Sequence, residues 1–458
     1  MKRAFSLGVL VLTLSIFAGC ITPPLRPRVT TTRAESKKID TGKFWWGISS
    51  SAFQNEDRGE VPGSPNYFQT DWDMFAKAGR VPKKEDRPYS WSNFDKDVEA
   101  LKRIGVNHYR FGIEWARVEP QKGRYNEAAI RRYVDMARKL KANGIEPVVT
   151  LWHFTFPDWL MTPHKPSRSR WLHPDFQDEW AAYVEKMTKA LSPYVRVYVP
   201  QNEPNGDLAL GYISSVWPPG VLLNIGTYKR AMNESVTSFR KAADIIHKNR
   251  KDALVMSVEA LPYWRWTFWD PTFAYYDFML HVNFDHLDRT ADVCDLIGFN
   301  YYYTEFADFT VLLALKARKG KNYSILGWVV QPDSLYKQIR AVYNRYHKPI
   351  VITENGIATT KDLKRVRYLF NHINAVHEAI ADGCDVRGYF VWTLVDNYEW
   401  HHGYKAPFGL TKFDEKTRKL LLRPSALMYH GLIDSSKGAD LLDKNSMPDG
   451  LPKGFMER

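Results

Sequence analysis

Eight short apolar runs that alternate with longer amphipathic segments restrict the fold of this chain more than any other feature. The runs are rich in β-branched and aromatic residues and lie at 44–49, 106–112, 146–151, 195–201, 254–258, 296–300, 350–353 and 388–392. The segments Asn126–Asn143 and Asp362–Asp382 place apolar residues at three- and four-residue spacing, and Gly144 and Gly383 follow as helix-ending residues. Strands that are apolar on both faces and alternate with such helices predict a parallel sheet covered by helices.

Eight strand–helix units predict an α/β fold, a single (β/α)₈ TIM barrel with extended βα loops. An open, doubly wound sheet is the structural alternative, but no Gly-rich phosphate loop follows the first run. The barrel is expected to span residues 41–434, without an internal repeat or a second domain. The long stretches Phe53–Asp97 and Tyr301–Pro332 are expected to be insertions at the barrel mouth.

The N-terminus has the layout of an export signal. Lys2 and Arg3 precede the apolar run Leu7–Phe17, which is too short for a membrane span and ends in Ala18-Gly19-Cys20. Small residues that end in Cys resemble the lipobox of bacterial lipoproteins, although Phe17 stands where that motif usually has Leu. Residues 1–20 are therefore predicted to be a lipoprotein-type signal peptide, with Cys20 lipidated and the protein anchored by that lipid to a membrane of the bacterial cell envelope, at the periplasm or the cell surface. A plain signal peptide with a coincidental Cys is the alternative.

The regions that flank the predicted barrel lack periodic patterns. Residues 21–40 are rich in Thr, Pro and Arg and are expected to be a flexible tether. Residues 435–458 are polar and are expected to be a peripheral C-terminal tail. Cys294 and Cys384 each stand just ahead of an apolar run, so we expect two buried free thiols rather than a disulfide.

The formal net charge of +13 raises the question of an anionic partner. The Lys and Arg residues are spread along helical stretches beside Glu and Asp, as on a solvated helix face. No nucleic-acid-binding motif accompanies them. We therefore expect no nucleic-acid partner.

Polar side chains gather at the carboxyl ends of the predicted strands. In (β/α)₈ barrels the reacting groups lie at these ends, because the βα loops form the open pocket. The residues concerned are Gln54, Arg110, His153, Asn202, Glu203, Asn300, Tyr302, Glu354, Trp392, Glu399 and Trp400. They end or follow seven of the eight strands, which predicts one shared site at the barrel mouth.

Glu203 and Glu354 follow strands that nearly face each other across this mouth. Hydrolysis of a glycosidic bond needs one carboxyl group to protonate the leaving oxygen, and a second to attack the anomeric carbon or to activate a water. A separation of roughly 5 Å between the carboxyl groups gives retention of configuration, and a wider gap gives inversion. Both outcomes stay open from the residues alone.

Several segments resemble glycoside hydrolase family 1, and the resemblance runs from Phe44 to about Asp434. Asn202-Glu203-Pro204 and the stretch 352–356 (ITENG) are similar to the family's acid/base and nucleophile motifs. The stretch 388–410 resembles its sugar-binding region after the last strand, and 109–111 and 298–302 also match. The resemblance implies a retaining, exo-acting β-glycosidase that needs no cofactor.

The resemblance also implies a role for each residue of the site. Glu354 would be the nucleophile, kept ionised by Arg110 and Tyr302, and would form a covalent glycosyl-enzyme intermediate. Glu203 would begin protonated, act first as acid and then as base. Asn202 would bind the 2-hydroxyl of the sugar. The other substrate-binding residues would be Gln54, His153, Tyr302, Trp392, Glu399, Trp400 and Phe408, with Arg110 and Asn300 in support.

Departures from the family pattern bear on the substrate and on metals. Phe154 follows His153 where the family usually has Trp, similar to some archaeal β-glycosidases and β-mannosidases. Glu399 would oppose the phosphate of a 6-phosphorylated sugar, so we expect non-phosphorylated β-glucosides, with β-mannosides or β-galactosides also open. The pair His401-His402 predicts no metal site, because neighbouring side chains point apart on a regular backbone and no further ligand spacing follows.

The predicted function is hydrolysis of terminal β-linked sugars from an oligosaccharide or another β-glycoside. Transglycosylation stays open if the acceptor site binds a sugar better than water. The alternative from another class is a catalytically silent carbohydrate-binding protein, but such proteins typically lose one catalytic Glu, and here both are present. A scaffold role that depends on the basic charge would require binding that survives loss of both carboxylates and vanishes with salt. The oligomeric state is not predicted.

Overall fold

The structure is a computed structural model that describes residues 44–435, except 60, 61, 65, 268, 269, 271, 272, 308–319 and 321. The expected signal peptide and tether, and Cys20 with them, lie outside the described residues. Of the expected tail, only Ser435 is described, as the last residue of a helix.

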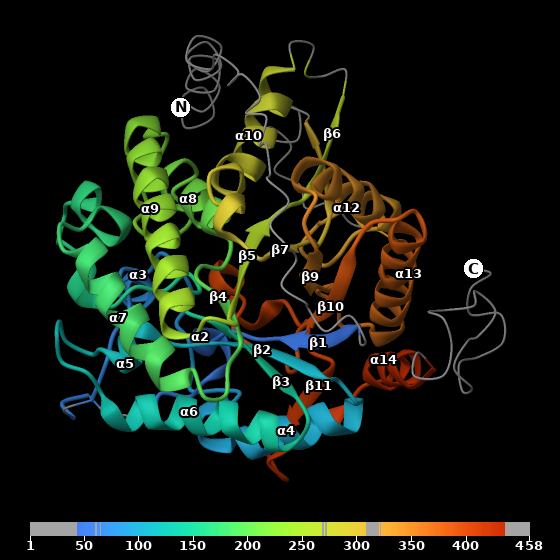
Figure 1. Cartoon of the computed structure of the whole chain (residues 1–458), viewed down its shortest axis with the longest axis horizontal. Coiled ribbons are helices and arrows are strands. Elements are labelled where there is room, and N and C mark those ends of the chain that lie inside the picture. Colours follow the sequence, from blue (N-terminus) through green and yellow to red (C-terminus); the bar gives the residue numbers. More distant parts are fainter. Residues whose placement is uncertain are drawn as a thin grey trace.

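All eight predicted strands form, and they close into one parallel barrel (Figure 1). In order around the barrel the strands are β1 (Trp45–Ser49), β10 (Val386–Trp392), β9 (Ile350–Asn355), β7 (Leu296–Asn300), β5 (Leu254–Ala260), β4 (Val197–Val199), β3 (Glu146–Thr150) and β2 (His108–Gly112). Strand β1 pairs with both β10 and β2, which closes the sheet. The predicted (β/α)₈ barrel is confirmed.

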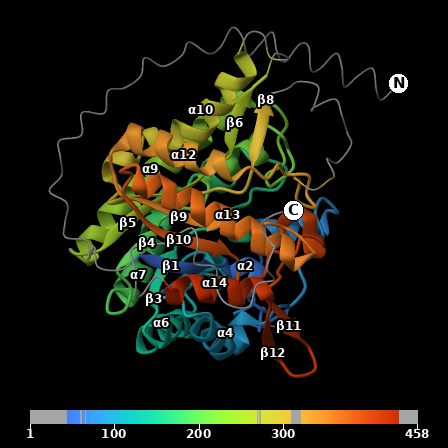
Figure 2. The same cartoon turned by 90° about the vertical axis from the view of Figure 1, so that its right-hand side faces the viewer.

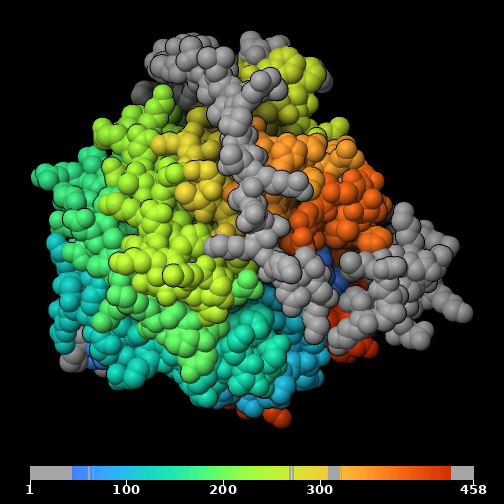
Figure 3. All heavy atoms as spheres, viewed as in Figure 1, coloured from blue at the N-terminus to red at the C-terminus, as the bar shows by residue number. Residues whose placement is uncertain are grey.

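Long helices surround the strands (Figures 1 and 2). They are α4 (Ser90–Ile104), α6 (Glu127–Ala142), α7 (Phe176–Leu191), α9 (Ile225–Asn249), α10 (Ala274–Asp288), α12 (Pro332–Tyr346), α13 (Asp362–Ala381) and α14 (Pro424–Ser435). In the space-filling view, α7 and α9 in green and α12 and α13 in orange cover one side of the molecule (Figure 3). The helix predicted at 126–143 begins after Asn126, whose side chain accepts from the Ala129 amide, and Gly144 follows it with φ 73°.

Two apolar layers hold the barrel together. One cluster includes Val148, Val199, Leu254, Val351 and Phe390 from five different strands. A larger cluster joins the strands to the surrounding helices. Complete burial of each such aliphatic side chain stabilises the fold by about 1.5–3 kcal/mol. The result is a rigid frame that fixes the position of every strand end.

Short helices occupy the connections. They are α2 (Ala52–Asn55), α3 (Asp71–Lys77), α5 (Trp115–Val118) and α8 (Pro204–Tyr212), with the 3₁₀ segments η1 (Asp158–Leu160), η2 (Pro166–Arg168), η3 (Arg170–Leu172), η4 (Ala291–Val293) and η5 (Trp400–Lys405). The predicted insertion after the first strand holds α2 and α3, and α4 begins inside its last residues.

Two small sheets were not predicted. Strands β6 (Tyr263–Trp266) and β8 (Thr304–Ala307) pair in parallel beyond β5 and β7. Strands β11 (Thr411–Asp414) and β12 (Lys419–Leu422) form a hairpin that projects from the body near α4 (Figure 2). The β6–β8 pair extends the barrel wall outward on the side where β5 and β7 end.

The two cysteines of the barrel are both buried free thiols, as predicted. Within the described residues, no helix has the length and apolar character that a membrane crossing requires.

Candidate active site

Glu354 lies near the end of β9 and accepts hydrogen bonds on both carboxylate oxygens. Arg110 Nη1 donates to Oε1 at 2.5 Å, and the Tyr302 hydroxyl donates to Oε2 at 2.6 Å. Arg110 is completely buried inside β2 and also donates to Asn202 Oδ1 at 2.6 Å and to Thr150 Oγ1 at 2.9 Å. A buried guanidinium needs such partners. This network therefore orients Glu354 and places a fixed positive charge beside it.

The backbone around Glu354 departs from regular strand pairing. The register between β7 and β9 shifts between Phe299 and Asn300, so that Asn300 pairs with Glu354. The register between β9 and β10 shifts in the same region. Such bulges re-aim a side chain at the end of a strand. Here they accompany the turn of Glu354 toward the pocket.

Glu203 stands at the junction between β4 and α8. Its backbone has φ 44° and ψ 49°, its amide donates to the Val258 carbonyl at 2.7 Å, and Pro204 begins the helix. Asn300 Nδ2 donates to Glu203 Oε1 at 2.8 Å, and Asn300 is itself held by the Thr353 hydroxyl at 2.7 Å. A left-handed conformation at a residue other than Gly costs about 1–3 kcal/mol and concentrates at functional sites. In this strained conformation the Glu203 carboxyl group is directed into the pocket.

The two carboxyl groups have different electrostatic surroundings. Burial, and then the negative charge of Glu354, raise the pKa of Glu203 to about 8. Burial also raises the pKa of Glu354, but the Arg110 guanidinium and the Tyr302 hydroxyl act in the opposite direction. Because Glu203 receives only an amide hydrogen bond where Glu354 receives a guanidinium, a proton shared by the pair resides on Glu203. These surroundings favour the protonated form of Glu203 and the ionised form of Glu354.

A set of polar groups lies at the other end of the site. Gln54 Nε2 donates to the Tyr398 carbonyl at 2.8 Å and to Glu399 Oε2 at 3.3 Å. Asn202 Nδ2 donates to His153 Nε2 at 3.2 Å, which places the proton of the neutral ring on Nδ1. Nδ1 is buried without a hydrogen-bond partner among the described residues. Burial lowers the pKa of His153 well below its ordinary range, so the ring offers a neutral donor.

Glu399 is a third carboxyl group in this site. Burial, followed by the charges of Glu354 and Glu203, raises its pKa to about 8. The predicted proximity of Gln54, His153, Asn202 and Glu399 to the catalytic pair therefore agrees with the structure.

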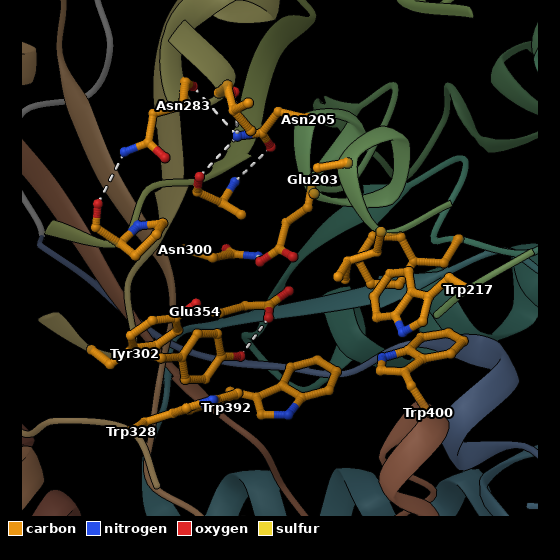
Figure 4. A pocket seen from close by; sticks show the side chains of 18 of the residues that line it. Glu203, Asn205, Trp217, Asn283, Asn300, Tyr302, Trp328, Glu354, Trp392 and Trp400 are labelled. Atoms are coloured by element: carbon orange, nitrogen blue, oxygen red, sulfur yellow. Dashed lines mark hydrogen bonds between the residues drawn. The ribbon is translucent and has the colours of Figure 1, made fainter. Parts of the chain in front are cut away.

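Aromatic rings line the pocket around the carboxyl pair (Figure 4). The His153 ring lies nearly parallel to Trp392 and to Trp400, with ring centroids 5.9 Å apart in each case. Phe408, in contrast, is not among the residues that line the pocket. It packs with Trp392 in a buried cluster, against the Tyr302 ring. Its contact with substrate stays a prediction. In the structure it packs behind Trp392 and Tyr302 and supports their rings.

The expectation that the His401 and His402 side chains point apart is wrong. The two rings lie with their centroids 3.9 Å apart, because this segment is irregular: Trp400 has φ 47° and Gly403 has φ 60°. His401 Nδ1 instead accepts from Trp217 Nε1 at 3.0 Å. Within the described part of the chain, no group of three or more His, Cys, Asp or Glu residues is arranged to hold a metal ion.

The pocket lined by His153, Glu203, Glu354, Glu399 and the aromatic rings has a volume of about 260 Å³. This lies close to the lower limit of small-molecule sites, about 300 Å³. Glu203 and Glu354, whose electrostatic surroundings differ, both line it. A scan against protein-family models matches residues 37–264 and 275–438 to glycosyl hydrolase family 1.

The chain belongs to glycosyl hydrolase family 1. It is a glycoside hydrolase, and its substrates are glycosides. Its relatives include the β-galactosidase of Saccharolobus solfataricus, 29% identical over 89% of this chain and 98% of that protein. β-Glucosidase A of Acetivibrio thermocellus is 26% identical over 86% of this chain and 98% of that protein. The chloroplastic galactolipid galactosyltransferase of Arabidopsis thaliana is 29% identical over 88% of this chain but only 66% of its own length.

Solved structures of similar chains share the fold. Fpglu1 from Fervidobacterium pennivoraus superimposes with a TM-score of 0.77 at 27% identity, over 86% of this chain and 96% of that one. A β-glucosidase from Thermotoga maritima gives a TM-score of 0.76 at 24% identity, over 87% and 98% of the two chains.

Sequence reasoning missed several residues of this family 1 pocket. Trp217, Trp264 and Trp328 line it, together with Met279 from α10. Trp217 and Trp328 come from connections, Met279 from a helix, and Trp264 from β6, which is not a barrel strand, so the rule that located the other residues does not reach them. The only signal in the sequence was the high content of Trp, 16 residues in all.

Proposed function

We propose that this family 1 enzyme is a retaining, exo-acting β-glycosidase that removes terminal, non-phosphorylated β-linked sugars. The observation that carries the proposal is the unequal support of the two carboxyl groups. Glu354 accepts from a guanidinium and a phenol, whereas Glu203 accepts from the amide of Asn300. A nucleophile must be ionised and an acid must be protonated, and these surroundings favour that division.

In the first step Glu354 attacks the anomeric carbon as the bond from that carbon to the leaving oxygen breaks. Glu203 gives its proton to the leaving oxygen, and a covalent glycosyl-enzyme forms. In the second step the Glu203 carboxylate takes a proton from water, the water oxygen attacks the anomeric carbon, and the bond to Glu354 breaks. Two inversions at one carbon give overall retention. Proton transfer of this kind typically contributes about 10²–10⁴-fold to the rate.

The charges of the pocket support a neutral sugar. Three carboxyl groups line it, those of Glu203, Glu354 and Glu399, and no Lys or Arg is found among its described lining residues. The guanidinium of Arg110 is already bonded to Glu354 and Asn202. A phosphate on the sugar would therefore find no free cation among these residues and would be repelled by the Glu354 carboxylate, which favours non-phosphorylated substrates.

The test is a panel of nitrophenyl β-glucoside, β-galactoside, β-mannoside, β-fucoside and 6-phospho-β-glucoside. Turnover of neutral members, with the β-anomer as the first product seen by proton NMR, supports the proposal. An α-anomer as first product, or a preference for the phosphorylated sugar, would contradict it. A molar ratio of free sugar to nitrophenol near one indicates hydrolysis, and a lower ratio indicates transfer to an acceptor.

We further propose that the enzyme is exported and lipid-anchored through Cys20. The support is the order of charged, apolar and small residues at 2–20, which ends in Cys. The full chain expressed in a bacterium should fractionate with membranes and carry a lipid mass at the N-terminus of its mature form. Cys20→Ser should lose the lipid, whereas Cys384→Ser, at a buried thiol, should keep it. An unlipidated mature protein would leave the plain signal peptide as the interpretation.

A further inference from the structure

One side of the pocket beyond the carboxyl pair is apolar. We call the apolar wall the set formed by Ala209 and Leu210 of α8, Ala260 and Pro262 after β5, and Met279 and Val282 of α10. These three segments pack against one another, since α8 and α10 also contact β5. The wall therefore belongs to the body of the fold and does not depend on one loop.

The asparagines of this region are turned to the backbone instead of the pocket. Asn205 Oδ1 accepts from the Ala260 amide at 3.0 Å, and its Nδ2 donates to the Ala260 carbonyl at 2.8 Å. Asn283 Nδ2 donates to the Pro262 carbonyl at 3.0 Å. Figure 4 shows these bonds on the far side of Glu203 from Glu354. Both amide groups therefore hold the segments of the wall together through the backbone.

Other polar groups lie near the wall, and some of them already have partners. The indole nitrogen of Trp264 is buried and has no hydrogen-bond partner among the described residues. His401 Nδ1 is taken by Trp217, and the Tyr303 ring stacks on Trp328 with centroids 4.9 Å apart. Tyr303, His402, Trp328 and Trp400 also line the pocket and carry further polar atoms, so the polar groups of this region lie outside the six residues of the wall.

The apolar wall lies beside the proton donor. A Cβ built on Gly206 would stand 3.5 Å from Glu203 Oε2 and 3.6 Å from the Ala260 Cβ. Gly206 thus lies between the Glu203 carboxyl group and the start of the wall. Because Glu203 must reach the leaving oxygen, the group attached to that oxygen lies against the wall.

We infer that the leaving group of the preferred substrate is an apolar alkyl or aryl group and not a second sugar. The inference rests on the proposed function, since it requires that Glu203 protonates the leaving oxygen. A second sugar would bring several hydroxyls against six side chains that carry no oxygen or nitrogen, and each hydroxyl left unpaired there loses affinity. An alkyl chain or an aromatic ring instead loses contact with water against Leu210, Met279 and Val282.

The test is a homologous series of alkyl β-glycosides on the sugar that the nitrophenyl panel selects. Methyl, butyl, hexyl and octyl glycosides, each below its micelle-forming concentration, have leaving alcohols of nearly equal reactivity, so differences report binding of the chain. We expect kcat/KM to rise by about fourfold for each methylene that the wall buries. The β-linked disaccharide of the same sugar should react no faster than the methyl glycoside, and a phenyl glycoside should show whether aryl groups are accepted as well.

Met279→Gln tests the wall itself, because the replacement keeps the length of the side chain and is compatible with a helix. It should reduce the rise of kcat/KM with alkyl chain length. We expect kcat/KM for the octyl glycoside to fall by at least fivefold more than kcat/KM for the methyl glycoside. Met74→Gln is the matched control, since Met74 is an exposed methionine of α3 that does not line the pocket. It should leave the series unchanged.

The outcomes separate the inference from the proposed function. No turnover of any nitrophenyl glycoside would overturn the proposed function itself. Turnover of the panel together with a flat alkyl series, or with a disaccharide that reacts faster than the octyl glycoside, would overturn the apolar leaving group alone. A steep series that Met279→Gln leaves unchanged would show that the chain binds elsewhere, and would overturn the wall as its site.

Discussion

Arg110 donates to Glu354 at 2.5 Å, and this ion pair lies between two side chains that are almost completely buried. A guanidinium stays protonated at every pH at which the protein is folded. The pair therefore gives the buried carboxylate a permanent positive partner, and Glu203 has no equivalent. The proposed chemistry depends on this asymmetry, which can be tested through pH, stability and product stereochemistry.

The pH dependence should follow the two carboxyl groups. Since Glu203 has a pKa of about 8, kcat/KM for an alkyl glycoside should fall as pH rises through that value and the acid loses its proton. It should also fall at low pH, where Glu354 becomes protonated. Glu203→Gln should remove the basic limb and reduce turnover of the alkyl glycoside by about 10²–10⁴-fold.

A dinitrophenyl glycoside provides the internal control for that variant. Its leaving group needs no proton, so Glu203→Gln should slow glycosylation of the enzyme far less with this substrate, as measured by the burst of phenolate. A basic limb that persists in Glu203→Gln would assign that limb to another group, and would remove Glu203 from the role of acid.

Asn300→Ala should move the basic limb upward. Asn300 donates to Glu203 Oε1 at 2.8 Å, a bond that favours the ionised form and so lowers the pKa of Glu203. Its loss raises that pKa further, and the fall of kcat/KM should occur at higher pH. Hydrogen bonds to charged groups contribute about 1.5–3 kcal/mol, so kcat/KM at the optimum should drop by about 10–100-fold. A downward shift of the limb would contradict the assignment.

Glu399→Gln should weaken recognition of the sugar and leave the fold intact. The variant keeps the volume of the side chain and can keep its contact with Gln54, but an amide nitrogen that cannot accept a hydrogen bond replaces one carboxyl oxygen. We expect kcat/KM for the preferred nitrophenyl glycoside to fall by about 10–100-fold. Glu99→Gln, at an exposed position of α4, is the control. An unchanged kcat/KM in Glu399→Gln would place sugar recognition elsewhere.

A buried ion network behind α8 should dominate the response of stability to mutation. Arg170 pairs with Asp71 at 2.8 Å and with Asp207 at 2.7 Å, and all three side chains are completely buried. Arg170→Met leaves two uncompensated carboxyl groups, and should lower the free energy of unfolding by about 3–5 kcal/mol in urea titrations at neutral pH. Arg345→Met breaks an exposed pair with Asp288 and should change it by about 1 kcal/mol or less. Equal effects of the two variants would contradict this account.

The barrel and most of its catalytic end could be predicted from the sequence for a physical reason. Strands buried on both faces read as apolar runs, and a polar residue such as Arg110 or Glu354 at the end of such a run needs a special environment. On these grounds the sequence predicts that Glu203, Asn300 and Glu354 lie close together. Strand ends agreed to within a few residues, and β7 agreed at both ends.

Other features depend on backbone conformation that cannot be inferred from the amino-acid sequence. The register shifts beside Glu354 and the left-handed backbone of Glu203 arise from tertiary packing. The close approach of the His401 and His402 rings follows from an irregular turn, and the expectation based on regular backbone was wrong there. The apolar wall joins α8 to α10, about 70 residues further along the chain, and nothing in either helix predicts that contact.

The most direct test of the central claim is azide rescue of Glu354→Gly on a nitrophenyl β-glycoside. The variant should lose about 10⁴-fold or more of the wild-type kcat, because no side chain remains to form the covalent intermediate. Azide should restore turnover by occupying the space left by the carboxylate, and should yield the α-glycosyl azide through a single inversion. A folded variant that keeps wild-type activity, or whose rescued product is the β-glycosyl azide, would contradict the assignment of Glu354 as nucleophile.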